Sequence, residues 1–219
     1  MKKTLFIKIA FAGLLFLSAS TGIFAQKSGF SLHFGGAFPT GDFKTPMATI
    51  ERESAPIEVG MMTGASLGMR YSFKLPVGFN LFVHAELAWN SLDKETKAKY
   101  HAVSKTVPQF VNVPLFAGVR YTTPFSEVFG IYAEAACGMD FLIKTQEGWK
   151  GETTKYQHSK AFAGDFGLGL TFIKKLSVGA HYYLLGNHVI SVKDPKPTTF
   201  PIDENMNVRM WMLKATIHM

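Results

Sequence analysis

The side chains best suited to chemistry are acidic, basic and histidine residues that recur at matching positions in separate segments of the chain. The charged ones are Arg70, Glu86, Arg120, Glu134, Asp140, Asp165 and Lys214, and the histidines among them are His33, His84 and His181. Paired carboxyl groups can act as a general acid and base, and histidines can bind a metal ion. The histidines lack the tight spacing of a metal motif. We therefore expect no metal, no cofactor and no catalytic site.

The segments that carry these side chains alternate between apolar and other residues with a period of two, which is typical of β-strands. The stretch 60–90 shows the pattern best and predicts two strands joined by a short turn at Lys74–Gly78. Its second half places one apolar set on one face, which is Phe79, Leu81, Val83, Ala85, Leu87 and Trp89. The other face mixes residues such as His84 and Glu86. The continuous face is therefore the apolar one.

A soluble sandwich would expose a polar face to water, whereas a small barrel in a membrane has an apolar outside and a mixed, packed interior. Eight such segments follow one another, approximately at 30–38, 61–73, 79–90, 109–121, 129–141, 162–172, 176–187 and 210–219. No segment after the start of the chain is long and apolar enough for a spanning helix, and only a closed barrel lets strands span a bilayer without unpaired backbone groups. The sequence predicts an all-β fold, an eight-stranded antiparallel up-and-down transmembrane β-barrel.

The connections between these segments alternate between long and short, beginning with a long one at Pro39–Val59. Bacterial barrels have short periplasmic turns and long extracellular loops, so we expect both termini on the periplasmic side of an outer membrane. Aromatic residues gather at both ends of the strands, as in two membrane girdles. The long segments carry lysines that are candidate contacts for lipopolysaccharide phosphates or a surface partner: Lys94, Lys97, Lys99, Lys105, Lys150 and Lys155.

The interior of an eight-stranded barrel is just wide enough to be filled by side chains, so charges there must pair with one another. We expect the charged set to be a structural lumen network in which each charge has a partner. Arg120 and Glu134 stand inward on neighbouring strands, as do Arg70 and Glu86, but the strand register decides which carboxylate each arginine meets. On the seventh segment Ser177, Gly179, His181, Tyr183 and Asn187 are expected to face inward. Pro114 interrupts the fourth segment and predicts a bulge or irregular pairing there.

The first 25 residues read as a secretory signal peptide, with Lys2 and Lys3 before an apolar run and small residues ending at Ala25. Residues 26–219 then form one barrel domain. Loss of three leader lysines lowers the formal charge from +7 to +4, which does not indicate nucleic-acid binding. The single Cys137 cannot form an internal disulfide. We expect a monomer whose partners are outer-membrane lipid and the barrel-assembly machinery.

The stretch 110–121 carries an apolar-Pro-Leu step at Val113, Pro114 and Leu115 and a basic-aromatic end at Arg120 and Tyr121. In this it resembles the outer-membrane β-barrel family common in Bacteroidetes. The resemblance implies a porin-like or OmpA-like small barrel, most of whose relatives lack an assigned activity.

The sequence is compatible with several functions. A structural or surface-interaction role without enzymatic activity fits best, and the alternatives are a porin-like channel or an accessory barrel in protein export. A lipid-modifying enzyme would need a nucleophile and base near the lipid face, where the outward positions are almost all apolar. A soluble lipocalin-like binder would need the opposite facing of the strands.

Overall fold

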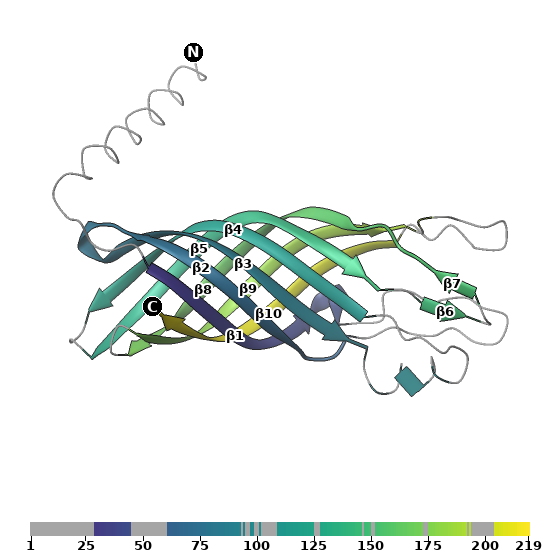
Figure 1. Ribbon diagram of the computed structural model, residues 1–219, viewed down its shortest axis with the longest axis horizontal. Helices are drawn as coiled ribbons and strands as arrows, with labels where there is room; N and C mark the ends of the chain where they lie inside the picture. Colours follow the sequence, from purple (N-terminus) through teal and green to yellow (C-terminus); the bar gives the residue numbers. More distant parts are fainter. Residues whose placement is uncertain are drawn as a thin grey trace, which may run out of the picture.

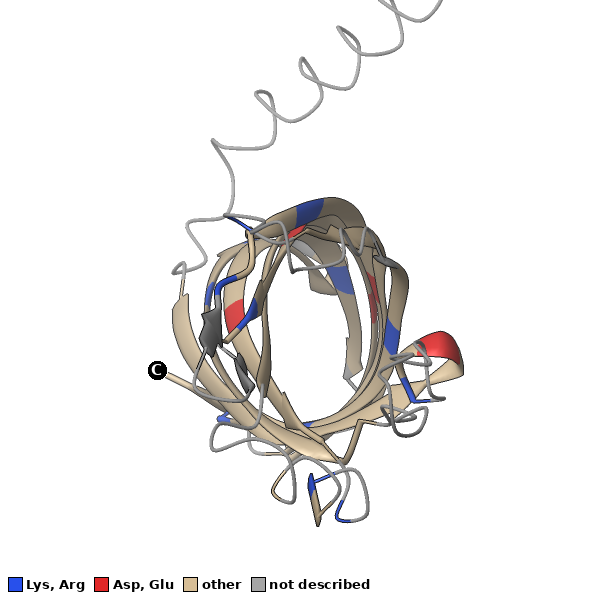
Figure 2. Cartoon of the chain, turned by 90° about the vertical axis from the view of Figure 1, so that its right-hand side faces the viewer, with Lys and Arg blue, Asp and Glu red and all other residues tan. Residues whose placement is uncertain are grey.

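The computed structural model describes residues 29–44, 61–92, 94, 97–98, 101, 109–124, 128–145, 147–149, 152–172, 175–191, 193 and 204–219. Within these ranges eight antiparallel strands close into a barrel in the order β1-β10-β9-β8-β5-β4-β3-β2 (Figures 1 and 2). Their bounds are β1 Gly29–Thr40, β2 Gly64–Lys74, β3 Phe79–Ser91, β4 Gln109–Pro124, β5 Phe129–Lys144, β8 Ser159–Phe172, β9 Leu176–Ile190 and β10 Glu204–His218. The predicted fold class is confirmed.

Each strand pairs with its neighbour in the chain, and β1 closes the ring by pairing with β10, where Ser31 lies opposite His218. The two ends of the barrel chain therefore meet, and the Met219 amide donates to the Phe30 carbonyl at 2.9 Å. Both ends lie on the side of the short turns, opposite the long connections (Figure 1). The β2–β3 turn is the short helix η3 Pro76–Gly78, in which Val77 and Gly78 have positive φ.

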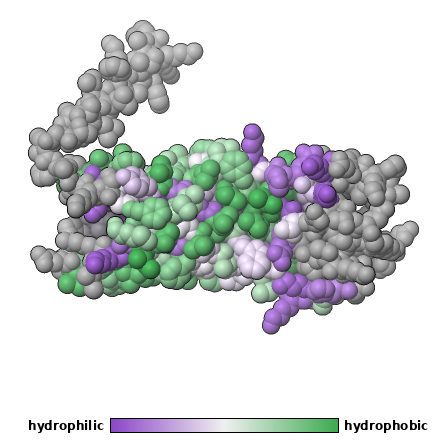
Figure 3. Space-filling model, viewed as in Figure 1, coloured by the Kyte–Doolittle hydropathy of each residue, from purple (hydrophilic) through white to green (hydrophobic). Residues whose placement is uncertain are grey.

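The outer surface of the barrel is apolar and the inner surface carries the charges. Large hydrophobic side chains such as Phe34, Leu67 and Leu168 are exposed, whereas Glu86, Asp165 and Lys214 are almost completely buried. On the face drawn in Figure 3, hydrophobic side chains cover the middle of the strands and hydrophilic ones lie toward the two ends. This is the facing expected of a membrane barrel and the reverse of a lipocalin-like calyx.

The alternation fails on β9, and one prediction is wrong as a result. Gly186 adopts φ +83 and the register with β10 shifts between Val208 and Arg209, which is a β-bulge. One extra residue in β9 exchanges the inward and outward directions of the side chains that follow it. Asn187 is exposed instead of facing inward, and His188 is buried in its place.

Pro114 produces a milder irregularity than a bulge. The register of β4 with β3 is the same on both sides of the proline, but Cα pairing is interrupted opposite Glu86 and Leu87. Pairing of Pro114 with Asp140 on β5 is continuous. The missing N–H of proline therefore breaks the ladder on one side only.

Two small elements lie at the long-connection end. The helix η2 Gly41–Phe43 follows β1, and its Phe43 is fully buried. The strands β6 Glu147–Trp149 and β7 Glu152–Thr154 form a separate hairpin inside the third long connection (Figure 1). No helix in the described ranges has the length and hydrophobicity needed to cross a membrane. The expected leader at 1–25 lies outside the described residues.

Candidate functional site: the charged lumen of the barrel

The interior of the barrel has two layers of different chemistry. Toward the long connections it also holds the buried Asp140 and His188, but most of the side chains there are apolar, and these include Phe43, Leu92, Phe110, Leu142, Leu185, Ile190, Met206 and Val208. Further from these connections lie six of the seven charged residues expected in the lumen, all buried: Arg70, Glu86, Arg120, Glu134, Asp165 and Lys214. Bulky rings are packed among them, with Tyr132 and Tyr183 almost inaccessible.

Arg70 and Glu134 form the central ion pair of the lumen. The two guanidinium NH₂ nitrogens of Arg70 donate to the two carboxylate oxygens of Glu134 at 2.6 and 2.8 Å. Because Arg70 is on β2 and Glu134 on β5, this bidentate pair crosses the lumen. The partner of Arg70, which the sequence leaves open, is therefore Glu134 and not Glu86 on the neighbouring strand. In the β2–β3 register Arg70 lies opposite His84, and its long side chain reaches past β3 and β4 to a carboxylate that offers both oxygens.

Arg120 is a secondary partner of the same carboxylate. It lies directly opposite Glu134 in the β4–β5 register, but its nearest guanidinium nitrogen is 3.9 Å from Glu134 Oε2. Its stronger contacts are hydrogen bonds to the hydroxyls of Thr171 and Ser177, both 2.9 Å long. The guanidinium also lies 3.6 Å from the centre of the Tyr132 ring. The neighbouring position on adjacent strands was predicted correctly, but it does not give the closest contact.

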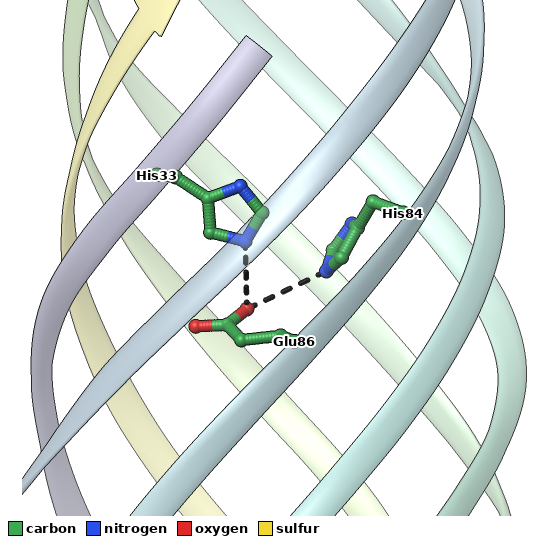
Figure 4. A group of neighbouring side chains, drawn as sticks. All are labelled: His33, His84 and Glu86. Carbon is green, nitrogen blue, oxygen red and sulfur yellow. Dashed lines mark ion pairs between the residues drawn. The ribbon is translucent and has the colours of Figure 1, made fainter.

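Glu86 is surrounded by donors from three other strands. Its Oε2 accepts a 2.5 Å hydrogen bond from the Tyr183 hydroxyl and lies 3.7 Å from Lys214 Nζ. The Nε2 atoms of His33 and His84 approach the same oxygen to 3.3 and 3.5 Å (Figure 4). No sequence pattern groups these two histidines, which are 51 positions apart.

A glycine on β2, the strand between β1 and β3, lets His33 reach Glu86. His33 on β1 lies opposite Gly68 on β2, and Gly68 lies opposite Glu86 on β3. A Cβ atom on Gly68 would stand 2.2 Å from His33 Nε2, so only glycine lets the imidazole extend over the middle strand to the carboxylate. Glu134, Gly167 and His181 repeat the same row on β5, β8 and β9.

The two rows are joined into one network. His181 Nδ1 lies 3.0 Å from Asp165 Oδ1 and 3.4 Å from Glu134 Oε1. Lys214 Nζ lies 4.0 Å from Asp165 and donates to the Tyr183 oxygen at 2.8 Å. A path of polar contacts therefore runs from Arg70 to Glu86.

Asp140 does not belong to this network. It pairs with His188 at 3.1 Å, and His188 Nε2 also lies 2.9 Å from the Leu185 carbonyl oxygen. Both side chains are fully buried. Sequence reasoning missed His188 because the bulge at Gly186 reverses the facing. The only signal was the adjacent apolar pair Leu184 and Leu185 just before the glycine, which interrupts the alternation.

One serine and one histidine have the geometry of a nucleophile and its base. Ser177 Oγ lies 2.8 Å from His218 Nε2, whose other nitrogen is 3.0 Å from Ser31 Oγ. A catalytic histidine is usually oriented by a carboxylate, whereas Ser31 supplies a hydroxyl. Ser177 is fully buried and already accepts a hydrogen bond from Arg120. This arrangement is suited to positioning Arg120.

The lysines expected to bind a partner are only partly described. Lys94 and Lys155 are exposed and Lys97 is half-exposed. Lys99, Lys105 and Lys150 lie outside the described residues.

Comparison with known proteins identifies the fold. No protein-family model and no curated protein matches the chain. Solved structures match over nearly the whole barrel. Neisserial surface protein A has a TM-score of 0.50 at 12% identity, covering 88% of this chain and 98% of its own. The outer membrane protein OprG from Pseudomonas aeruginosa has a TM-score of 0.50 at 10% identity, with coverages of 89% and 97%.

The outer membrane protein AlkL, solved by solid-state NMR in lipid bilayers, has a TM-score of 0.54 at 10% identity, with coverages of 91% and 93%. At such low identity the likeness speaks for the fold and not for a shared activity. The chain has the fold of the small eight-stranded β-barrels found in bacterial outer membranes.

Proposed function

We propose that this chain is an integral, monomeric barrel of a bacterial outer membrane whose packed interior makes it a rigid scaffold for its long external connections. The observation that carries the proposal is the pairing of an apolar outer face with a lumen that contains both a charged network and an apolar layer. A filled barrel leaves the loops as the place for surface interaction. The barrel-assembly machinery would insert it, and its resemblance to Bacteroidetes barrels fits this role.

The same packing supports a structural role for the lumen charges instead of an enzymatic one. Glu134 has both oxygens committed to Arg70, and Glu86 is held by Tyr183 and Lys214. An acid or base must reach a substrate to act, and these carboxylates are almost fully buried. A role for the exposed Lys94 and Lys155 in contacting lipopolysaccharide phosphates follows from their charge and position.

The purified protein should conduct ions poorly in planar lipid bilayers. Bulky side chains fill the lumen beside the charged network and are almost inaccessible to solvent: Tyr132, Tyr183, Phe116 and Met212. A hydrated path through the barrel would therefore have to break packed contacts. Single-channel recordings would measure the conductance, and a general porin would serve as the positive control. Large and steady single-channel currents would instead favour the porin-like alternative.

Protease treatment of intact cells should cut the long connections and spare the turn that follows Lys74. The proposed orientation places the segment 94–105 outside the cell and the exposed Lys74 in the periplasm. Trypsin should therefore cleave within 94–105 on intact cells, and after Lys74 only once the outer membrane has been permeabilised. Cleavage after Lys74 alone on intact cells would establish the opposite orientation.

A further inference from the structure

The two imidazoles beside Glu86 stand from its carboxylate at the spacing of ligands around a tetrahedral metal ion. His33 Nε2 and His84 Nε2 lie 3.3 and 3.5 Å from Glu86 Oε2. The Tyr183 oxygen lies 3.2 Å from His84 Nε2 but only 2.5 Å from Glu86 Oε2, so it would have to move away from the carboxylate to become a fourth ligand. Zinc bonds to nitrogen and oxygen are about 2.0–2.2 Å long, so ligand atoms at the corners of a tetrahedron stand about 3.3–3.5 Å apart. His33, His84 and Glu86 converge on one point from β1 and β3 (Figure 4).

One of these three converging atoms lacks the hydrogen bond that a buried polar atom needs. His33 is 1% exposed, yet its Nε2 has no hydrogen-bond partner among the described residues. The 3.3 Å approach of His33 to Glu86 is close without having hydrogen-bond geometry. A buried polar atom without a partner costs free energy, and a cation held between these atoms would remove that cost.

The second row of the lumen has the same residue types but is already satisfied. Glu134, Asp165 and His181 also bring three donors close together, but both oxygens of Glu134 accept hydrogen bonds from Arg70. A metal ion there would have to displace a bidentate guanidinium. The structure therefore distinguishes two similar clusters: in one the carboxylate is held by arginine, and in the other an imidazole nitrogen has no hydrogen-bond partner among the described residues.

We propose that His33, His84 and Glu86 form a binding site for a divalent transition-metal ion of the zinc type inside the lumen, with Tyr183 at the fourth position. Two imidazoles and one carboxylate are a zinc ligand set. The ion would link β1 to β3 and, through Tyr183, to β9 on the other side of the barrel. On binding, the Tyr183 hydroxyl gives up its hydrogen bond to Glu86 and its proton passes to solvent.

The charge of Lys214 should weaken metal binding at this site. Its ammonium lies 3.7 Å from Glu86 Oε2 and 2.8 Å from the Tyr183 oxygen, and it is 3% exposed. A positive charge so close to the ligands opposes a bound cation. Lys214 and the metal ion therefore compete for the same carboxylate, and removal of the lysine charge should strengthen metal binding by about tenfold or more.

The test uses cobalt(II) as a visible probe for zinc. The mature chain without a histidine tag is refolded from urea into detergent with cobalt(II), desalted and analysed for metal by mass spectrometry and visible absorption, with folding checked by heat-modifiable gel migration. The expected result is about one cobalt ion per chain, with the intense absorption of a tetrahedral site, and its displacement by zinc. His33→Gln and Glu86→Gln should retain none, and Lys214→Met should bind cobalt more tightly.

His158→Gln is the matched control, since His158 is exposed and outside the lumen, and it should bind as the wild type does. If His33→Gln fails to fold, His84→Gln takes its place. Folded wild-type protein that retains no cobalt overturns the proposal. So does full retention by both ligand variants, or weaker binding by folded Lys214→Met than by the wild type.

Discussion

Replacing Glu134 with leucine should lower the free energy of unfolding by about 3–5 kcal/mol, because it strands the buried guanidinium of Arg70 without its partner. Arg70 is 4% exposed and donates both of its close hydrogen bonds to this carboxylate. Removal of one member of a buried pair leaves an uncompensated charge, whereas removal of both members can be nearly neutral. Reversible urea unfolding in lipid vesicles would measure the loss.

Two double variants separate the two arginines that face Glu134. Arg70→Met combined with Glu134→Leu should recover most of the lost stability, because the bidentate partner is removed together with the carboxylate and Arg120 still donates to Thr171 and Ser177. Arg120→Met combined with Glu134→Leu should recover much less, because Arg70 is still left without its partner. Arg120 lies 3.9 Å from the carboxylate and has other hydrogen bonds, to Thr171 and Ser177, so its own removal relieves little. If Arg120→Met restored more than Arg70→Met, the assignment of the central pair would be wrong.

The contrast between these arginines shows what the sequence could predict about the lumen. Alternation with a period of two determines which residues face inward, so the burial of Arg70, Arg120 and Glu134 followed from the pattern alone. It does not determine height in the barrel, which depends on the stagger of every strand pair. The partner of Arg70 comes from β5, across the lumen, and no pattern within one hairpin contains that information.

The histidine cluster was missed for a related reason. The register of the β2–β3 hairpin follows from its short turn and places Gly68 opposite Glu86. The strands β1 and β2 are joined by a long connection, so the sequence does not determine their register. It is this register that places His33 opposite Gly68. A glycine between two large polar residues on neighbouring strands is a usable signal, but it can be recognised only after both registers are known.

The bulge at Gly186 marks the limit of pattern reasoning on a single strand. Glycine in a strand is compatible with a bulge, a bend or a simple close approach, and only a bulge reverses the facing of the residues that follow. His188 is therefore buried and Asn187 exposed, which is the reverse of the predicted pattern. The apolar layer near the long connections includes Leu185 from the same irregular stretch.

A charge placed on the outer face should destabilise the barrel in proportion to its depth in the bilayer. Leu168 is 67% exposed, lies within β8 and stands opposite Ala133 on β5 and Ala180 on β9. Leu168→Arg should therefore lower the free energy of unfolding in lipid vesicles by about 2–4 kcal/mol, because arginine at the bilayer midplane is costly.

Val189→Arg is the matched control for this prediction. Val189 is 47% exposed and lies next to the end of β9 that leads into a long connection, where the cost of a charge should be about 0–1 kcal/mol. A soluble barrel would show no such difference, since both residues would face water and arginine at either position would cost little. Equal and small losses at both positions would contradict the membrane placement, whereas a loss confined to Leu168 would place the middle of β8 in the hydrocarbon core.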